Sequence, residues 1–211
     1  MTRFKRFRAA GAFAAVIAAV GTPSRAGATS ETEAEAPISV PTAELRLVGG
    51  TGLGVEAAGS LLNHRLRVDT GLHGWIKGTL AEGAALARLV GPASNALWVR
   101  GGFLFQSIDY SCGITDNVSA WDAGLAYRKR WAGGSLFAAE GGVEYVSRDH
   151  GIYCNDSVVP GASGGLRLAV GGQVALTRWL GIYGRAGVRT GSHLMEIGFL
   201  PELWAGLAFE I

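Results

Sequence analysis

The sequence predicts an all-β fold: a closed, antiparallel, eight-stranded transmembrane β-barrel that follows a cleaved N-terminal signal peptide. Three observations support this prediction. The first 28 residues have the layout of an export signal. Eight later segments alternate apolar and polar residues, with the charges confined to one face of each segment. No uncharged run after the signal approaches the roughly 20 residues that a membrane-spanning helix needs.

The predicted signal peptide begins with a basic head, which is followed by the small and apolar run Ala9–Val20 and by the small-x-small motif at Ala26 to Ala28. An uncleaved anchor helix is the alternative, but this apolar run is too short to cross a bilayer core of about 30 Å. The next residues are acidic, contain two prolines and lack apolar periodicity, which is typical of a flexible leader. We therefore predict three parts, with cleavage after about Ala28: a signal peptide (1–28), a periplasmic leader (29–42) and an outer-membrane barrel (43–211).

Removing the signal changes the charge balance of the chain. The full sequence has 19 basic and 17 acidic residues, and five of the basic ones lie in the signal. The mature chain then has 14 basic residues against 17 acidic ones, a net charge of −3. This balance gives no indication of a nucleic-acid partner.

The alternation is visible from the first predicted strand. Successive side chains of a strand point to opposite faces of the sheet. In Glu44–Glu56, leucines and a valine occupy one face, while Glu44, Arg46 and Glu56 occupy the other. The segments with this pattern cover residues 44–56, 66–77, 97–106, 121–128, 137–145, 166–176, 182–189 and 202–211.

The nature of the two faces favours a membrane barrel. A soluble barrel encloses its apolar face, whereas an outer-membrane barrel turns that face outward and keeps polar residues in the lumen. Here the polar face combines glycine with charges of both signs, as a narrow lumen would require. The apolar face also continues to the last residue, Ile211. A secreted β-sandwich remains the alternative.

Eight strands divide the connections between two sides of the membrane. With a periplasmic N-terminus, the inner connections are 79–95, 129–134 and 177–179, and Ala81–Leu89 could form a small amphipathic helix in the first of them. The outer loops are then 58–65, 108–119, 147–161 and 190–198.

The signal peptide, the eight alternating segments and the C-terminal run LWAGLAFEI together resemble the small outer-membrane barrel superfamily of OmpA-like and OmpX-like proteins. The resemblance covers residues 43–211 and implies an outer-membrane location in contact with lipid and lipopolysaccharide. It also implies recognition of the last strand by the barrel-assembly machinery. The superfamily usually ends in phenylalanine, whereas this chain ends in Ile211.

The two cysteines, Cys112 and Cys154, fall in the second and third predicted outer loops, which are neighbours around the rim. An exported protein with an even number of cysteines passes through an oxidising compartment, so we expect a Cys112–Cys154 disulfide, with free thiols as the alternative. His150 lies near Cys154, but no CxxC spacing accompanies it, and we expect no metal site. The Asp and Asn residues of these loops could hold calcium, but they also suit ordinary turns, which we favour.

The charges of the polar face predict a closed lumen. The interior of an eight-stranded barrel is just wide enough to be filled by side chains, and unpaired buried charges are costly. We therefore expect opposite charges to pair into a plug, with a narrow channel or carrier for small molecules as the alternative. The predicted lumen network consists of Arg46, Arg67, Asp69, Arg100, Asp122, Glu140, Glu144, Arg167, Arg185, Arg189 and Glu202.

An enzymatic function is the third possibility. Ser192, His193 and Glu196 have the residue types of a hydrolase triad. Adjacent side chains of an extended segment point to opposite faces, however, and a triad depends on geometry. We expect no catalysis and no cofactor, and the predicted function is a non-enzymatic structural or surface-interaction barrel; a lipid-modifying enzyme is the less favoured alternative.

Overall fold

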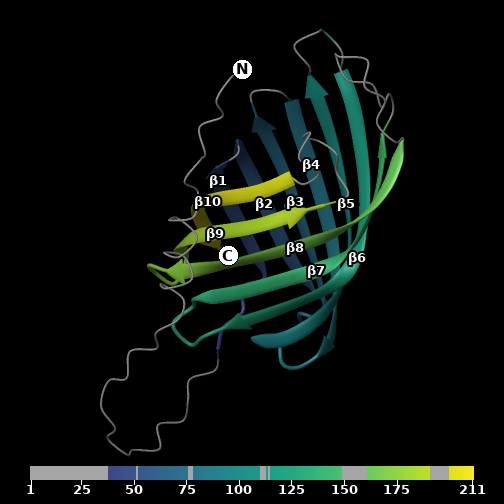
Figure 1. The fold of residues 1–211 in the computed structure, drawn as a ribbon. Helices are drawn as coiled ribbons and strands as arrows, with labels where there is room; N and C mark the ends of the chain where they lie inside the picture. Colours follow the sequence, from purple (N-terminus) through teal and green to yellow (C-terminus); the bar gives the residue numbers. More distant parts are fainter. Residues whose placement is uncertain are drawn as a thin grey trace, which may run out of the picture. The chain divides into compact units, whose positions relative to one another are not determined.

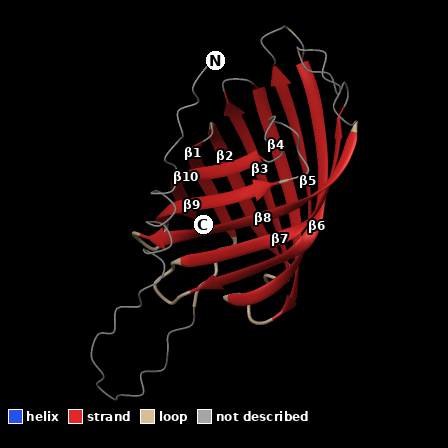
Figure 2. Ribbon diagram, in the orientation of Figure 1, coloured by secondary structure: helices blue, strands red, loops and turns tan. Residues whose placement is uncertain are grey.

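The computed structural model describes residues 38–50, 52–75, 78–109, 113, 115–148, 161–190 and 200–211. These residues form strands joined by turns (Figures 1 and 2). The predicted signal peptide and most of the predicted leader lie outside this part of the chain. No helix of the described residues is long and apolar enough to span a membrane.

Ten strands are present in the described residues, and they close into one antiparallel barrel (Figure 1). Each strand pairs with its neighbours in sequence, and the first strand pairs with the last to close the wall. The strands are β1 Ala43–Gly50, β2 Leu53–Leu61, β3 Leu66–Trp75, β4 Gly78–Val90, β5 Asn95–Asp109, β6 Thr115–Arg130, β7 Leu136–Arg148, β8 Ala162–Ala175, β9 Leu180–Arg189 and β10 Leu200–Glu210.

The all-β, closed and antiparallel character of the prediction is confirmed, but the predicted number of eight strands is wrong. The segment Glu44–Glu56 covers most of β1 and the first half of β2 rather than a single strand. Leu45, Leu47, Leu53 and Val55 are all exposed, so the alternation keeps its phase across the hairpin turn. An alternation that does not change phase gives no sign of a turn, so the sequence pattern predicts one strand where the structure has two.

The second missing strand is β4. The expected helix at Ala81–Leu89 is wrong, because this segment pairs with β3 on one side and β5 on the other. Its alanines and leucines favour a helix intrinsically, by at most a few tenths of a kcal/mol per residue. Pairing on both edges satisfies the backbone N–H and C=O groups of the segment within the wall, and this tertiary context determines its structure.

The two extra strands change which connections share an end of the barrel. We call the end that holds Thr42 and Ile211 the terminal end, and the opposite end the loop end. The 62–65 turn was predicted as part of an outer loop at the far end from the termini, and this is wrong: the amide of Ser60 donates to the carbonyl of Thr42 over 2.8 Å. The turns 91–94, 131–135 and 176–179 also lie at the terminal end, while the connections after β1, β3, β5, β7 and β9 leave from the loop end.

Candidate functional site

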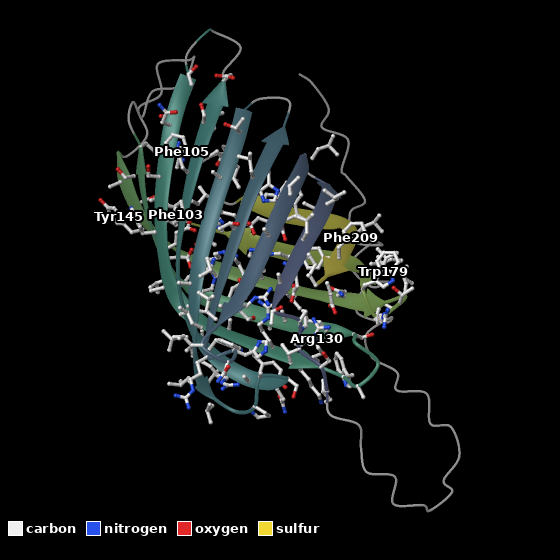
Figure 3. The ribbon with its side chains drawn as sticks, turned by 180° about the vertical axis from the view of Figure 1, so that it is seen from behind. Phe103, Phe105, Arg130, Tyr145, Trp179 and Phe209 are labelled. Carbon is white, nitrogen blue, oxygen red and sulfur yellow. The ribbon has the colours of Figure 1, made fainter. Side chains whose placement is uncertain are left out.

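The outer face of the wall is apolar on every strand. Large hydrophobic side chains are exposed on all of the described strands of the closed barrel. Figure 3 labels Phe103, Phe105 and Tyr145 on this outer face, whereas Arg130 lies inside. The exposed set includes Leu45, Leu47, Leu53, Val55, Val68, Leu72, Leu89, Val99, Phe103, Trp121, Leu125, Val143, Tyr145, Leu166, Leu168, Val174, Ile182, Leu203 and Leu207.

Aromatic side chains form two bands on this face, over β5 to β8. The band toward the loop end joins three strands, because Trp121 pairs in register with Phe103 and with Tyr145. The band toward the terminal end includes Trp131 and Trp179, which lie at the turns before β7 and before β9. Between these bands, the outward positions of the described strands carry one charged residue, Lys129, whose ammonium lies over the ring of Trp131 at the edge of the zone.

The separation of the bands can be estimated along β6. Trp121 and Trp131 are ten positions apart in the chain, which corresponds to about 33 Å at roughly 3.3 Å per residue. A strand tilt of about 35–45°, typical of membrane barrels, reduces this to roughly 23–27 Å along the barrel axis. That height is close to the apolar band of about 25 Å in outer-membrane barrels.

The inner face of the wall carries the charges, and they form ion-paired networks. The first, which we call the terminal network, centres on Glu44 of β1. Glu44 pairs with Arg46, with Arg67 at 3.0 Å and with Arg130 at 3.7 Å, and thereby connects β1, β3 and β6. The members of the terminal network are Glu44, Arg46, Glu56, Arg67, Asp69, Arg128, Arg130 and Glu210.

A second set, the β5–β8 network, takes one residue from each of four consecutive strands. Arg100 pairs with Asp122 and lies 3.4 Å from Glu140, whose carboxylate accepts from Arg167 over 2.8 Å.

The third set, the Arg189 network, crosses the full width of the lumen. Arg189 of β9 pairs with Glu144 and Glu202, and its Nη2 lies 3.5 Å from Glu82 of β4. Arg185 also reaches Glu82, at 3.4 Å. Because β4 and β9 are diametrically opposed in the ring of strands, these contacts close the lumen from side to side. The members of the Arg189 network are His73, Glu82, Glu144, Arg185, Arg189 and Glu202.

All the charged residues predicted for the lumen face it, and each takes part in at least one ion pair. The structure distributes them over the three networks rather than over one continuous network. Most of them are buried: Arg167 and Arg189 are each 2 % exposed, whereas the side chain of Asp69 keeps 25 % of its exposure.

Sequence reasoning missed Glu82, which joins β4 to both Arg185 and Arg189. The sequence pattern predicts that Glu82 lies in a connection, where no inward direction can be given to its side chain. A weak signal could have found it: Glu82 and Arg88 stand an even number of residues apart, as two charges on one face of a strand do.

A small cavity separates the networks. It has a volume of about 50 Å³ and is lined by charged groups that include Arg46, Glu56, Glu82 and Arg100. A buried water needs roughly 10–15 Å³ by this measure, so the cavity holds only a few waters. Around this cavity, the side chains of the described residues therefore fill the lumen.

The loop-end sites predicted from sequence lie outside the described residues. These are Cys112 and Cys154, whose pairing stays a prediction, and Ser192, His193 and Glu196. The strands that carry the cysteine connections are adjacent, since Val118 of β6 pairs with Arg148 of β7. Arg148 in turn forms an ion pair with Asp116 near this end of the barrel.

No protein family, no curated protein and no solved structure matched this chain in three comparisons.

Proposed function

We propose that this protein is an integral β-barrel of a bacterial outer membrane, with a structural or surface-interaction role and without catalysis. The observation that carries this proposal is the orientation of the two faces of the wall, which is the reverse of that in a soluble barrel. Apolar side chains are exposed on every described strand, and the charged networks are enclosed in the lumen. Soluble monomers seldom expose a continuous apolar patch larger than a few hundred Å². A wall that is apolar around its whole circumference is favourable in contact with lipid chains.

The two aromatic bands support the same proposal. Tryptophan and tyrosine are favoured at the membrane–water interface because their rings combine an apolar body with a polar group. The bands at Trp121 and Trp131 flank an apolar zone of the height that a bilayer core requires, and Lys129, the one charge on its outward positions in the described strands, lies at the edge of the zone beside Trp131. Lipid would then contact Leu125 and Val143 between them, and lipopolysaccharide would contact the loop end.

Sidedness follows from the strand order. The N-terminus of an exported barrel stays periplasmic, so we place the terminal end in the periplasm and the connection of β7 to β8 outside the cell. The exposed C-terminal strand β10, with Leu203 and Leu207 facing outward, is the segment that we propose the assembly machinery recognises.

Epitope insertion tests location and sidedness together. A short epitope placed after Asp156, in the β7–β8 connection, should bind antibody on intact cells. The same epitope placed after Asn63, in the 62–65 turn, should bind only after the outer membrane is permeabilised. Labelling of neither site on intact cells, or labelling of the Asn63 site alone, would contradict the proposed orientation.

The filled lumen favours a plug over a channel. A conducting path would have to displace Glu82 from both Arg185 and Arg189, which bridge opposite walls. Separating buried ion pairs without replacing the partners is costly. Planar-bilayer recordings of the refolded protein are therefore expected to show no discrete conductance steps. Reproducible steps would support the channel alternative and contradict the proposal that the lumen is plugged.

A further inference from the structure

The imidazole of His73 is buried in the lumen, in a space that the surrounding residues leave for it. The ring is 2 % exposed and packs against the indole of Trp204, with ring centroids 4.3 Å apart. Glycines at 54 and 71 leave the space that the ring fills, because a Cβ at either position would collide with it. The contact with Trp204 thus positions the ring, and the lack of side chains at residues 54 and 71 makes room for it.

The polar atoms at this position are not satisfied by the protein. Neither ring nitrogen of His73 has a hydrogen-bond partner among the described residues, and the Nε2–Oε1 distance to Glu82, 3.6 Å, is too long for one. Glu56 Oε1 is also buried without a partner, while its Oε2 accepts from Arg46 over 3.2 Å. Buried polar atoms without partners are costly, and a ligand that bonded to both residues would remove that cost.

The charge balance of the lumen points to the same place. Within the described residues, the terminal network sets four arginines against four carboxylates, and the β5–β8 network sets two against two. The Arg189 network has two arginines, Arg185 and Arg189, against three carboxylates. This leaves one negative charge in excess beside His73, which a cation would offset.

We propose that Glu56, His73 and Glu82 form a binding site for a divalent transition metal of the Zn²⁺ type. Each residue offers one ligand atom, and these atoms lie within 4.8 Å of one another. The imidazole distinguishes this set from an all-oxygen calcium or magnesium site, because nitrogen ligands favour zinc and its neighbours. Glu56 and Glu82 also line the lumen cavity, which supplies room for water to complete the coordination.

Metal binding is compatible with the surrounding arginines. Arg185 donates a hydrogen bond to Glu82 Oε1 over 3.4 Å, and Arg189 lies 3.5 Å from Glu82 Oε2, so both contacts are longer than the usual 2.7–3.2 Å of such bonds. Both arginines retain Glu202 when Glu82 turns toward a metal. Glu56 can keep Arg46 on Oε2 and present Oε1 to the ion.

Zinc titration of the folded barrel tests the site. The protein is the mature chain with both cysteines replaced by serine and without a histidine tag, refolded in detergent micelles, so the result does not depend on where the protein resides. Zn²⁺ is titrated in competition with a chromophoric chelator, and we expect one ion per chain. His73→Gln should lower the affinity at least about 100-fold, since even losses outside the ligand set cost 10- to 100-fold.

Matched variants separate this site from others. His64→Gln removes an imidazole in the 62–65 turn, and Glu140→Gln removes a lumen carboxylate of the β5–β8 network; neither should change zinc affinity. Glu56→Gln provides a second test if His73→Gln does not refold, and X-ray absorption should report one imidazole with oxygen ligands. Absence of a stoichiometric ion in the parent protein, or zinc affinity unchanged by loss of His73 or Glu56, overturns the proposal.

Discussion

Leu125→Arg is expected to lower the free energy of unfolding in a lipid bilayer by about 2–4 kcal/mol. Leu125 is 48 % exposed on β6 and lies four residues from Trp121 and six from Trp131, near the middle of the zone between the two aromatic bands. If this zone faces lipid, the guanidinium must be placed in or drawn out of the hydrocarbon core. On a soluble barrel the same substitution would replace one exposed side chain by another and change stability by at most about 0.5 kcal/mol.

Leu62→Arg is the matched control. Leu62 is 73 % exposed, but it lies in the turn at the terminal end and so outside the zone between the aromatic bands. We expect an effect of no more than about 1 kcal/mol, as found for charges near the interface. Equilibrium denaturation in vesicles of defined lipid measures both variants. Equal and small losses for the two substitutions would argue against a lipid-facing wall.

Arg189→Met is expected to lower the free energy of unfolding by about 3–5 kcal/mol, the range observed when one partner of a buried ion pair is removed. Arg189 is 2 % exposed and contacts three carboxylates, those of Glu82, Glu144 and Glu202. Methionine fills a similar volume but leaves these negative charges close together in a poorly solvated lumen. The loss should appear both as a lower denaturation midpoint and as incomplete refolding in micelles.

Two further substitutions control for side-chain size and for charge. Arg178→Met removes an exposed arginine from the 176–179 turn and should change stability by no more than about 0.5 kcal/mol. Arg189→Lys keeps the positive charge but loses the planar donor geometry. Its loss of unfolding free energy should therefore lie between those of Arg178→Met and Arg189→Met. If Arg189→Met is as stable as Arg178→Met, the network does not hold the lumen together.

Much of the wall was predictable because its alternation is strong. Trp121, Leu125 and Tyr127 against Asp122 and Arg128 indicate both a strand and the direction of its two faces, and the structure places them accordingly. Charges of both signs on one face likewise indicated that the lumen would be ion-paired.

The number of strands could not be obtained in the same way. The β1–β2 hairpin preserves the phase of alternation, so only the glycines around Thr51 mark it. In β4 the small residues Gly83, Ala84 and Ala85 give little contrast between the faces, and helix-forming residues competed with the strand pattern.

The candidate metal site could not be predicted from the sequence for a related reason. Glu56, His73 and Glu82 belong to three different strands, and their proximity depends on the register in which β2, β3 and β4 pair. With β4 assigned to a connection, Glu82 had no predicted neighbour. A register is a property of the closed barrel, and local patterns do not contain it.

The dependence of folding on an apolar environment tests the central claim most directly. The mature chain, diluted from urea, is followed by its migration on gels without boiling and by circular dichroism, with and without lipid vesicles. We expect a compact, heat-modifiable β-sheet form only when vesicles or micelles are present, because the exposed wall needs an apolar surrounding. A folded, monomeric and soluble protein in buffer alone would contradict the account.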